Sequence, residues 1–450
     1  MDQMRTALRG LAETAVTAPA DDPASLWSQG RRRVRRRRLA AAGAVAAAVV
    51  AAGASSLVAV PAAVVHPAGA THEPAIPRNV WEARDWYPTT SEEGPPGVVA
   101  VLGGVIRGDR NGLFTVSATT GEYRLLDLPA AAAETSLTGT EYALAPDGRH
   151  IAYWIAGRPG GVPVVRDGES ATRVQIGVGI YDTDDGSVEW VEFRTAHGID
   201  GSGLMWADDD HLLVTYGERA DSGSDPGSMV SVDVGTELVT VADAARRRAI
   251  TIPEGGAGLT ADGALTALPS RRRAVTVPLD GTAPRTLARL PRMRAFAPSS
   301  AWTSSEAIML PGNRLLGGRN NYGADQTMVG SLAPDGTVGA LRKVRGIAFV
   351  QPVAWLDDRD LLVIGDGRSS DEWGALYRLD TSDGAVTPLG TAQAGMYAPG
   401  LQFATDLLGA PMVEGERPPT VDSRWLRGGG AVLALLGSCA AILLWRRRRA

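Results

Sequence analysis

A hairpin that recurs along the middle of the chain constrains the fold more than any other feature. The stretch "LFTVSATTGEYRLLDL", from Leu113, has two apolar strands around a turn that contains glycine, and five similar stretches follow it at spacings of 65, 49, 46, 55 and 48 residues between the turn glycines. A fixed period of this length is typical of a repeat architecture. The six predicted turn glycines are Gly121, Gly186, Gly235, Gly281, Gly336 and Gly384.

A second kind of hairpin lies between these copies. It has an apolar entry, a polar turn and an apolar exit, as in "LAPDGRHIAYW" from Leu144 and "AWLDDRDLLVIG" from Ala354. A tryptophan recurs at the entry, where a bulky side chain is expected to pack between neighbouring sheets. These residues are Trp206, Trp302 and Trp355.

Two hairpins in each period of about 50 residues predict a four-stranded antiparallel sheet, and such sheets bury their faces when they are arranged radially. We therefore expect an all-β protein, a six-bladed β-propeller, or a seven-bladed one if residues 97–107 and the C-terminal stretch "YAPGLQFATDLLG" form separate sheets. In the six-bladed form, that C-terminal stretch completes the first blade as a clasp. The propeller is predicted over residues 97–410, between linkers at 61–96 and 411–427.

One copy of the second hairpin resembles a known repeat. "LAPDGRHIAYW" is similar to the Pro-Asp-Gly repeat of WD40-like (PD40) propellers of the TolB type, with matches that include Pro146, Asp147 and Gly148. The resemblance implies a propeller fold. It implies little about activity, because this fold carries enzymes, sensors and scaffolds alike.

Two uncharged segments flank the predicted propeller. Residues 39–60 and 428–445 are long enough to cross a bilayer as helices, since about 20 residues span its hydrocarbon core. Arginine blocks precede the first segment and follow the second, so the positive-inside rule places both ends of the chain in the cytoplasm and the propeller outside. These topology-determining residues are Arg31, Arg32, Arg33, Arg35, Arg36, Arg37, Arg38, Arg446, Arg447, Arg448 and Arg449.

Alternatives remain open for the segments at the two ends. Ala68-Gly69-Ala70 has the small residues of a signal-peptidase site, so the first segment is either an anchor or a cleaved signal, although it is longer than the apolar core of most signals. The predicted cytoplasmic tail, residues 1–38, is short and in part helical or disordered. It is either a solvated or membrane-surface segment or a docking peptide for a cytoplasmic partner. The tail at 446–450 is basic.

Charge and composition restrict the classes of function. Residues 71–427 have a net charge of −14, which argues against binding of nucleic acid by the body of the protein. The only cysteine, Cys439, lies in the second uncharged segment, so neither a disulfide within the chain nor a zinc site built on cysteines is expected. One lysine among many arginines, with abundant Ala, Gly and Val, suggests a GC-rich genome such as that of an actinobacterium.

The chain has no recognisable catalytic or cofactor motif. Its five histidines form no metal-binding pattern, and no Gly-x-Ser-x-Gly or phosphate-binding glycine loop occurs. The densest carboxylates are "DTDDGS" and "ADDDH", where turn chemistry is the simpler interpretation and calcium a weak alternative. The weak calcium candidates are Asp182, Asp184 and Asp185. No catalytic residue, cofactor site or firm metal ligand is predicted.

We therefore expect a binding, sensing or scaffolding module at the cell envelope, whose partner is an envelope protein or a wall polymer. The alternative is an envelope hydrolase or lyase that uses carboxylates from several blades. Carboxylates gathered at the mouth of the central channel would favour the enzyme, and an apolar or aromatic face would favour the binder. Two basic triplets, Arg246–Arg248 and Arg271–Arg273, are either solvated charge or a contact for an anionic partner.

Overall fold

The computed structural model describes the central part of the chain, which belongs to a single compact unit. The described residues are 73–107, 110–132, 141–165, 173–221, 229–252, 257–259, 264–270, 273–290, 302–304, 306–310, 327–347, 350–365, 374–393, 400–415 and 417–418. Both predicted membrane segments, the tail at 1–38 and all eleven arginines of the flanking blocks lie outside these residues. Within the described ranges, no helix is long and apolar enough to cross a bilayer.

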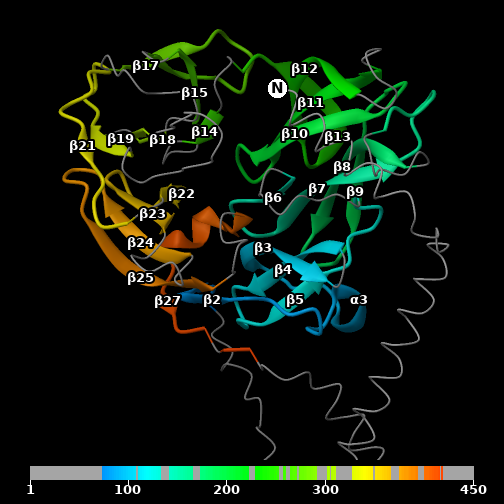
Figure 1. The fold of residues 1–450 in the computed structure, drawn as a ribbon, viewed down its shortest axis with the longest axis horizontal. Coiled ribbons are helices and arrows are strands. Elements are labelled where there is room, and N and C mark those ends of the chain that lie inside the picture. The colour runs from blue at the N-terminus through cyan, green and yellow to red at the C-terminus, as the bar shows by residue number, and fades with distance from the viewer. Residues whose placement is uncertain are drawn as a thin grey trace, which may run out of the picture. The chain divides into compact units, whose positions relative to one another are not determined.

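Six antiparallel sheets follow one another along the chain and form the blades of a β-propeller (Figure 1). Blade 1 consists of β26 (Gln402–Phe403), β3 (Val99–Arg107), β4 (Arg110–Ser117) and β5 (Tyr123–Leu126). Blade 2 consists of β6 (Tyr142–Leu144), β7 (His150–Gly157), β8 (Val174–Asp182) and β9 (Val188–Glu192). Blade 3 consists of β10 (Ile199–Trp206), β11 (His211–Asp221), β12 (Met229–Thr240) and β13 (Asp243–Ile250).

The remaining three blades have the same order of strands. Blade 4 consists of β14 (Ala257–Leu259), β15 (Leu265–Ser270), β16 (Arg273–Thr276) and β17 (Arg285–Arg289). Blade 5 consists of β18 (Trp302–Thr303), β19 (Ala307–Leu310), β20 (Met328–Ser331) and β21 (Arg342–Lys343). Blade 6 consists of β22 (Val350–Trp355), β23 (Asp360–Gly365), β24 (Ala375–Asp380) and β25 (Val386–Gln393), with β2 (Asn79–Trp81) added in parallel at its outer edge.

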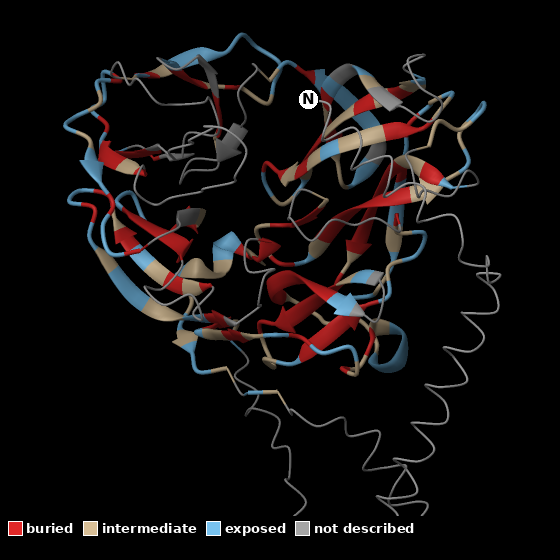
Figure 2. Cartoon of the chain, in the orientation of Figure 1, coloured by how far each residue is buried: buried red, intermediate tan, exposed pale blue. Residues whose placement is uncertain are grey.

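The ring is closed because each blade packs on the next through a buried apolar cluster. One cluster joins blades 1 and 2, others join 2 to 3, 3 to 4, 4 to 5 and 5 to 6, and a further cluster joins blade 6 back to blade 1. Figure 2 shows this burial concentrated in the middle of the blades, with exposed residues along the outer strands and turns. Apolar faces that a single sheet would leave in water are thus covered on both sides, which is the main source of stability in such a fold.

The two ends of the propeller meet at the junction of blades 6 and 1, which we call the seam. The C-terminal strand β26 pairs with β3 as the first strand of blade 1, so the predicted clasp and the six-bladed count are confirmed. The predicted linker at 61–96 carries β2, β1 (Ile76–Pro77) and the short helix α3 (Thr90–Glu93). Strand β1 pairs in parallel with β27 (Met412–Val413), which follows the 3₁₀ helix η4 (Thr405–Gly409).

Five of the six predicted turn glycines lie in tight turns. Gly121, Gly186, Gly281, Gly336 and Gly384 all have φ between 71° and 81°, a left-handed conformation in which a side chain is unfavourable. The prediction for Gly235 is wrong. This residue lies inside the 12-residue strand β12, and the hairpin of blade 3 turns at residues 241–242. The stretch around Gly235 resembles the other hairpins in sequence, but Gly235 has an extended backbone and pairs with Tyr216.

The repeat residues of the second hairpin form inter-blade contacts where the structure describes them. Trp206 is buried in the cluster between blades 2 and 3 and donates its indole N–H to the carbonyl of Ala143, 3.0 Å away in blade 2. Trp355 is buried between blades 5 and 6. The backbone of Trp302 begins β18, but its side chain is outside the described part. Trp206 and Trp355 thus pack between neighbouring blades.

Candidate functional site

The first strands of neighbouring blades contact one another around the centre of the ring, as β6 does with β10 and with β26. Each blade therefore begins at the channel and ends at the periphery. The turn between a blade's first and second strands and the turn between its third and fourth strands lie on one side of the sheet. We call this side the turn face.

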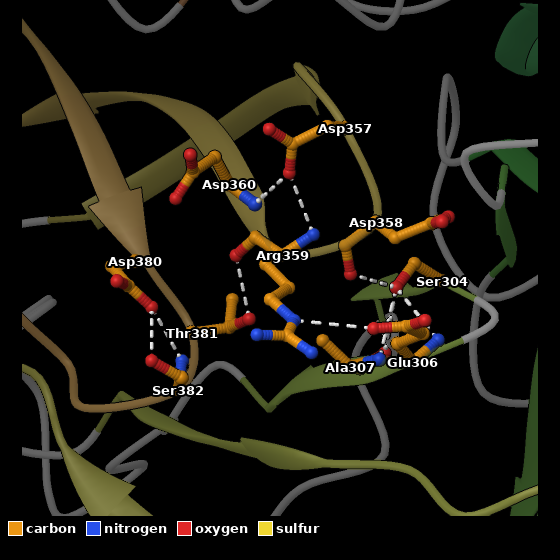
Figure 3. Close-up of polar contacts among 10 residues, drawn as sticks. All are labelled: Ser304, Glu306, Ala307, Asp357, Asp358, Arg359, Asp360, Asp380, Thr381 and Ser382. Carbon is orange, nitrogen blue, oxygen red and sulfur yellow. Dashed lines mark hydrogen bonds and ion pairs between the residues drawn. The ribbon is translucent and has the colours of Figure 1, made fainter.

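Turns of one design recur on the turn face. In blade 2, the carboxylate of Asp182 accepts the backbone N–H groups of Asp184 and Asp185, and Gly186 donates to the Asp182 carbonyl. In blade 6, the carboxylate of Asp380 accepts the backbone N–H and the hydroxyl of Ser382 (Figure 3), and Gly384 donates to the Asp380 carbonyl. Aspartate therefore serves here as a local acceptor that fixes the turn.

The outer turns are tied to the inner turns of the same blade by buried threonines. Thr183 Oγ1 donates to the carbonyl of Arg149 at 3.0 Å, and Thr381 Oγ1 donates to the carbonyl of Arg359 at 2.6 Å. Figure 3 shows Thr381 beneath Arg359. These matching bonds fix the outer turn to the inner turn in blades 2 and 6, because a buried threonine hydroxyl would be costly without a partner.

Neighbouring blades also contact each other on this face. Ser304 Oγ of blade 5 donates to the carbonyl of Asp358 in blade 6 at 2.7 Å, and Arg359 Nε of blade 6 lies 3.2 Å from Glu306 of blade 5 (Figure 3). The Arg359–Glu306 pair is exposed, so it contributes little stability.

Carboxylates from three blades gather beside the channel on the turn face. Asp209 of blade 3 accepts the backbone N–H of Asp147 of blade 2 at 3.0 Å, and Asp406 in η4 donates its own N–H to the carbonyl of Pro146 at 3.0 Å. Burial raises the pKa of Asp209, and the neighbouring charges of Asp147 and Asp406 raise it further. Burial and then the charge of Asp147 raise the pKa of Asp406 in the same way. The sequence did not identify this group as a site because its members are far apart along the chain. Asp147 and Asp209 are separated by 62 residues, and Asp209 and Asp406 by 197.

The weak calcium candidates take part in the turn of blade 2. Asp182 and Asp185 accept backbone N–H groups, and Asp184 forms an ion pair with Arg149. Among the described residues, no group of three or more His, Cys, Asp or Glu side chains is placed to hold a metal ion. The hydrogen bonds match the turn interpretation of these residues.

The repeat motif of blade 2 is fixed by a close approach to blade 1. Gly148 has a φ of 76°, and a Cβ atom there would lie 2.2 Å from the carbonyl oxygen of Val99. Glycine is therefore required at this position of the Pro146-Asp147-Gly148 turn. The motif thus allows blade 2 to pack closely on blade 1.

A small cavity opens at the seam, away from the turn-face carboxylates. Its volume is about 160 Å³, and its lining consists of Glu82, Ala83, Arg84, Asp85, Trp86, Gly104, Val105 and Ile106. The segment 82–86 connects β2 of blade 6 to α3, whereas Gly104–Ile106 belong to β3 of blade 1. Sequence reasoning missed this site because its two walls come from a predicted linker and a separate strand.

Three of the five histidines and four of the six arginines in the basic triplets lie within the described residues. His150 begins β7 and lies 5.8 Å from Trp206 between ring centroids, His211 pairs with Asp208 at 2.8 Å, and His197 Nδ1 lies 2.8 Å from the carbonyl of Val162. His66 and His72 are outside the described residues. The triplet Arg246–Arg248 is exposed on β13. Of the second triplet, Arg273 begins β16 and its two neighbours lie outside the described part.

The comparisons with known proteins show a similarity in fold alone. No family model matches the chain, and no curated protein matches it. Similar solved structures include an oligogalacturonate lyase in complex with manganese, at 14% identity and a TM-score of 0.38 over 62% of this chain and 76% of that one.

Two further structures show the range of proteins with similar architecture. YCF48 bound to a D1 peptide has 13% identity and a TM-score of 0.36 over 75% of this chain and 88% of that one. Prolyl oligopeptidase B from Galerina marginata has 11% identity and a TM-score of 0.38 over 66% of this chain, which spans 42% of that protein. At these scores the likenesses carry no functional argument.

Proposed function

We propose that the protein is a membrane-anchored, extracytoplasmic propeller that acts as a non-catalytic binding, sensing or scaffolding module at the cell envelope. The observation that supports this proposal best is the parallel pairing of β1 with β27, which brings the two ends of the propeller side by side at the seam. Arg78 and Asn79 both contact Glu414, and the Arg417 guanidinium lies 4.9 Å from the ring centre of Trp81. Two predicted membrane helices would then attach to one edge of the ring.

The segments that connect the propeller to the two predicted membrane helices are short. Twelve residues separate the first predicted span from Glu73, and nine separate Pro418 from the second. At about 3.3 Å for each extended residue, these segments reach at most about 40 Å and about 30 Å. A propeller tethered in this way samples partners at or near the bilayer, such as an envelope protein or a wall polymer. Its acidic body does not suit a nucleic acid.

The topology is tested by cysteine labelling in intact cells. Cys439 is replaced by Ser, and a single cysteine is introduced either at Val162, which is 75% exposed, or at Ser28 in the predicted cytoplasmic tail. A membrane-impermeant maleimide should label Val162→Cys in intact cells and Ser28→Cys only after lysis. Labelling of Ser28→Cys in intact cells, or of Val162→Cys only after lysis, would contradict the proposed topology.

The binding role is tested by in vivo crosslinking of the tagged full-length protein, followed by mass spectrometry of the proteins that co-purify. A reproducible partner that is lost when residues 71–427 are deleted, but kept when 1–38 are deleted, supports a propeller-centred scaffold. A partner lost with 1–38 instead makes the tail the output of a sensor. Recovery of no protein in either case counts against the scaffold.

A second candidate, an envelope hydrolase or lyase, is favoured by one specific observation. The carboxylates of Asp147, Asp209 and Asp406 come from three blades, and the pKa values of Asp209 and Asp406 are raised. Carboxyl groups with raised pKa values are candidates for general acid catalysis. If the protein is such an enzyme, Asp209→Asn should remove its activity on wall polysaccharide, and the exposed control Asp243→Asn should not. An unchanged rate in Asp209→Asn would exclude Asp209 as the acid.

A further inference from the structure

Basic side chains gather on the outer strands of three consecutive blades. Strands β13, β17 and β21, the outer strands of blades 3, 4 and 5, carry seven basic residues and one acidic residue. Strands β5, β9 and β25, the outer strands of blades 1, 2 and 6, carry one basic and two acidic residues. We call the seven basic residues the basic rim; they are Arg246, Arg247, Arg248, Arg285, Arg289, Arg342 and Lys343.

Hydrogen bonds between neighbouring blades join these outer strands into one continuous edge. The Arg248 guanidinium of β13 donates to the carbonyls of Leu279 and Asp280, in the outer turn of blade 4. The backbone N–H of Arg289 in β17 donates to the carbonyl of Gly336, in the outer turn of blade 5, at 3.0 Å. The basic rim is therefore one surface that spans adjacent blades.

The side chains of the basic rim are exposed, and few of their charges are compensated nearby. Arg247 lies 3.8 Å from Glu237. Within the described residues, the side chains of Arg246, Arg289 and Arg342 make no hydrogen bond or ion pair. Exposed charges more than about 8 Å apart are largely screened at physiological salt. The acidic residues of distant blades therefore do not cancel the positive field at the rim, although residues 71–427 have a net charge of −14.

The spacing of these cations suits a chain of anions better than a single ion. Along β17, Arg285 and Arg289 are separated by about 13 Å, at ~3.3 Å for each residue. A small anion on this open surface would contact one or two guanidinium groups, and a single exposed pair contributes little. A flexible polymer would contact many of them, and each contact would release counterions. Guanidinium groups bond phosphate and carboxylate through two parallel N–H groups.

The basic rim lies across the ring from the seam. In the closed ring, blades 3 and 4 are opposite the junction of blades 6 and 1 (Figure 1). If the two predicted membrane helices attach at the seam, the rim is the part of the propeller farthest from their attachment. This position favours a polymer that extends away from the bilayer over the lipid surface itself.

We infer that the basic rim of blades 3, 4 and 5 binds a linear, flexible anionic polymer of the cell wall, through its repeated phosphate or carboxylate groups. The assignment to the wall rests on the proposed function, whereas the preference for a polyanion depends on the described residues alone. A rigid nucleic-acid duplex suits the rim less well, because it would also approach the acidic residues of β9 in blade 2, Glu189 and Glu192.

The test is arginine footprinting of the full chain in a non-ionic detergent. Phenylglyoxal modifies accessible guanidinium groups, and mass spectrometry reads the rate at each residue, which separates the rim from the arginine blocks near the chain ends. The probes are inorganic polyphosphate and polygalacturonate. At least one should slow the modification of Arg246, Arg289 and Arg342 about threefold or more at about 50 mM salt, and about 1 M salt should remove this protection. Protection by one polymer alone identifies phosphate or carboxylate as the recognised group.

The matched control residues are Arg84, Arg158 and Arg359, which are exposed outside blades 3 to 5 and should react at unchanged rates. Two triple variants compare the sets at equal net charge. In the rim variant, R246Q/R289Q/R342Q, the polymer concentration that half-protects Arg285 should rise about tenfold or more. In the control variant, R84Q/R158Q/R359Q, it should stay the same. Both variants should keep the melting temperature of the unchanged protein, because all six side chains are exposed.

Three results would overturn the inference. They are no protection of the rim by either polymer, equal protection of the rim and control arginines, and protection by phosphatidylglycerol vesicles but by neither polymer. The last result would make the rim a membrane-binding surface instead. Each of them leaves the crosslinking test of the proposed function intact, because that test detects protein partners.

Discussion

The junction between blades 2 and 3 and the seam between blades 6 and 1 are both filled by a buried apolar cluster but are held in different ways. At the first, the chain passes directly from β9 to β10 through residues 193–198, and Trp154, Phe193 and Trp206 fill the interface. At the seam the chain also passes from blade 6 to blade 1, from β25 to β26 and from β2 to β3, but β26 and β3, which pair in blade 1, lie at opposite ends of the propeller sequence. Phe114, Tyr123 and Phe403 fill that interface, and strands from both ends of the propeller complete the sheets on either side.

The difference shows what a ring needs at the point where its chain begins and ends. In blade 3 the four strands follow one another in sequence, which keeps paired strands at a high effective concentration. At the seam, β26 joins blade 1, β2 joins blade 6, and β1 pairs with β27, so three pairings between segments far apart in sequence hold the two ends of the chain in the ring. Gln402 adds hydrogen bonds to Leu144 and Tyr142 of blade 2, at 2.7 and 2.8 Å.

Removing β26 should cause the largest loss of stability at the seam. A chain that ends after Pro399 lacks β26, η4 and β27, whereas one that ends after Pro418 keeps them. The shorter chain loses the burial of Leu401, Phe403 and Ala404. Losses of 2–5 kcal/mol for a large buried side chain approach the total stability of a domain, so we expect no cooperative thermal transition. Calorimetry of both chains measures this, and a normal transition in the shorter one would mean that blade 1 does not need its first strand.

A matched pair of truncations compares the two interfaces directly. Phe403→Ala at the seam and Trp206→Ala between blades 2 and 3 both remove an aromatic side chain that is 3% exposed. Each should lower the free energy of unfolding by about 3–5 kcal/mol in a denaturant titration. Only Phe403→Ala should also make the C-terminal segment sensitive to protease under native conditions, because β26 is held by few residues. Equal protease sensitivity in both variants would argue that the seam is no different from the other junctions.

Two glycine substitutions probe the added strand of blade 6. A Cβ atom at Gly390 would lie 1.8 Å from the carbonyl oxygen of Arg78, so Gly390→Ala must push β2 away from β25. We expect a cost of about 1–3 kcal/mol, typical of overpacking. The control is Gly235→Ala in β12, where nothing lies within 4 Å, and its change should stay within about 0.5 kcal/mol. Equal melting temperatures for the two variants would show that β2 can move away from β25 without loss of stability.

The smallest expected effect is a dependence on pH at the turn face. The folded-state pKa values of Asp209 and Asp406 are raised by burial and by neighbouring carboxylates, so their ionisation opposes folding, and this penalty is removed as the pH falls through those raised values. Asp209→Asn keeps an acceptor for the Asp147 N–H and should stabilise the protein slightly, by less than about 1 kcal/mol, near neutral pH. The gain should vanish in acid. Destabilisation at neutral pH would refute this account of the carboxylate group.

Asp380 and Asp357 of blade 6 should change stability with pH in the opposite direction. The Ser382 hydroxyl lowers the pKa of Asp380. For Asp357, burial alone would raise the pKa, but the backbone N–H groups of Arg359 and Asp360 outweigh it and the pKa is lowered. Both groups therefore contribute stability at neutral pH that is lost as the pH falls through their lowered values. A titration of stability in Asp380→Asn should show a smaller acid loss than the unchanged protein.

The blades were predictable from the sequence because their turns are local. A glycine with positive φ recurs in the outer turns of five blades, with an aspartate near it in blades 2, 4, 5 and 6, and the apolar strands on either side identify the hairpins. The clasp by "YAPGLQFATDLLG" was also predictable, since the first period lacked its own entry hairpin. Gly235 misled the prediction because a lone glycine in a strand looks like a turn when no pairing partner is known.

The seam and its cavity were not predictable for a physical reason. Strand β2 has three residues and β1 and β27 have two each, too short for an alternating pattern to show. Their partners lie more than 300 residues away in sequence, as Asn79 and Thr391 do. The cavity at Trp86 and the carboxylates near Asp209 likewise join distant segments, so only the closed ring brings them together.

Native-state hydrogen exchange tests the closure of the ring most directly. Within blade 1, the N–H of Ala404, next to β26, bonds to the carbonyl of Ala100 in β3, and Leu212, Leu213 and Val214 lie in the centre of blade 3. If the chain ends lock the ring, the amides of β26 and β3 should exchange only through global unfolding, with the same free energy of opening as those of β11. Exchange at the seam that is orders of magnitude faster, while β11 stays protected, would contradict a ring that its chain ends hold closed.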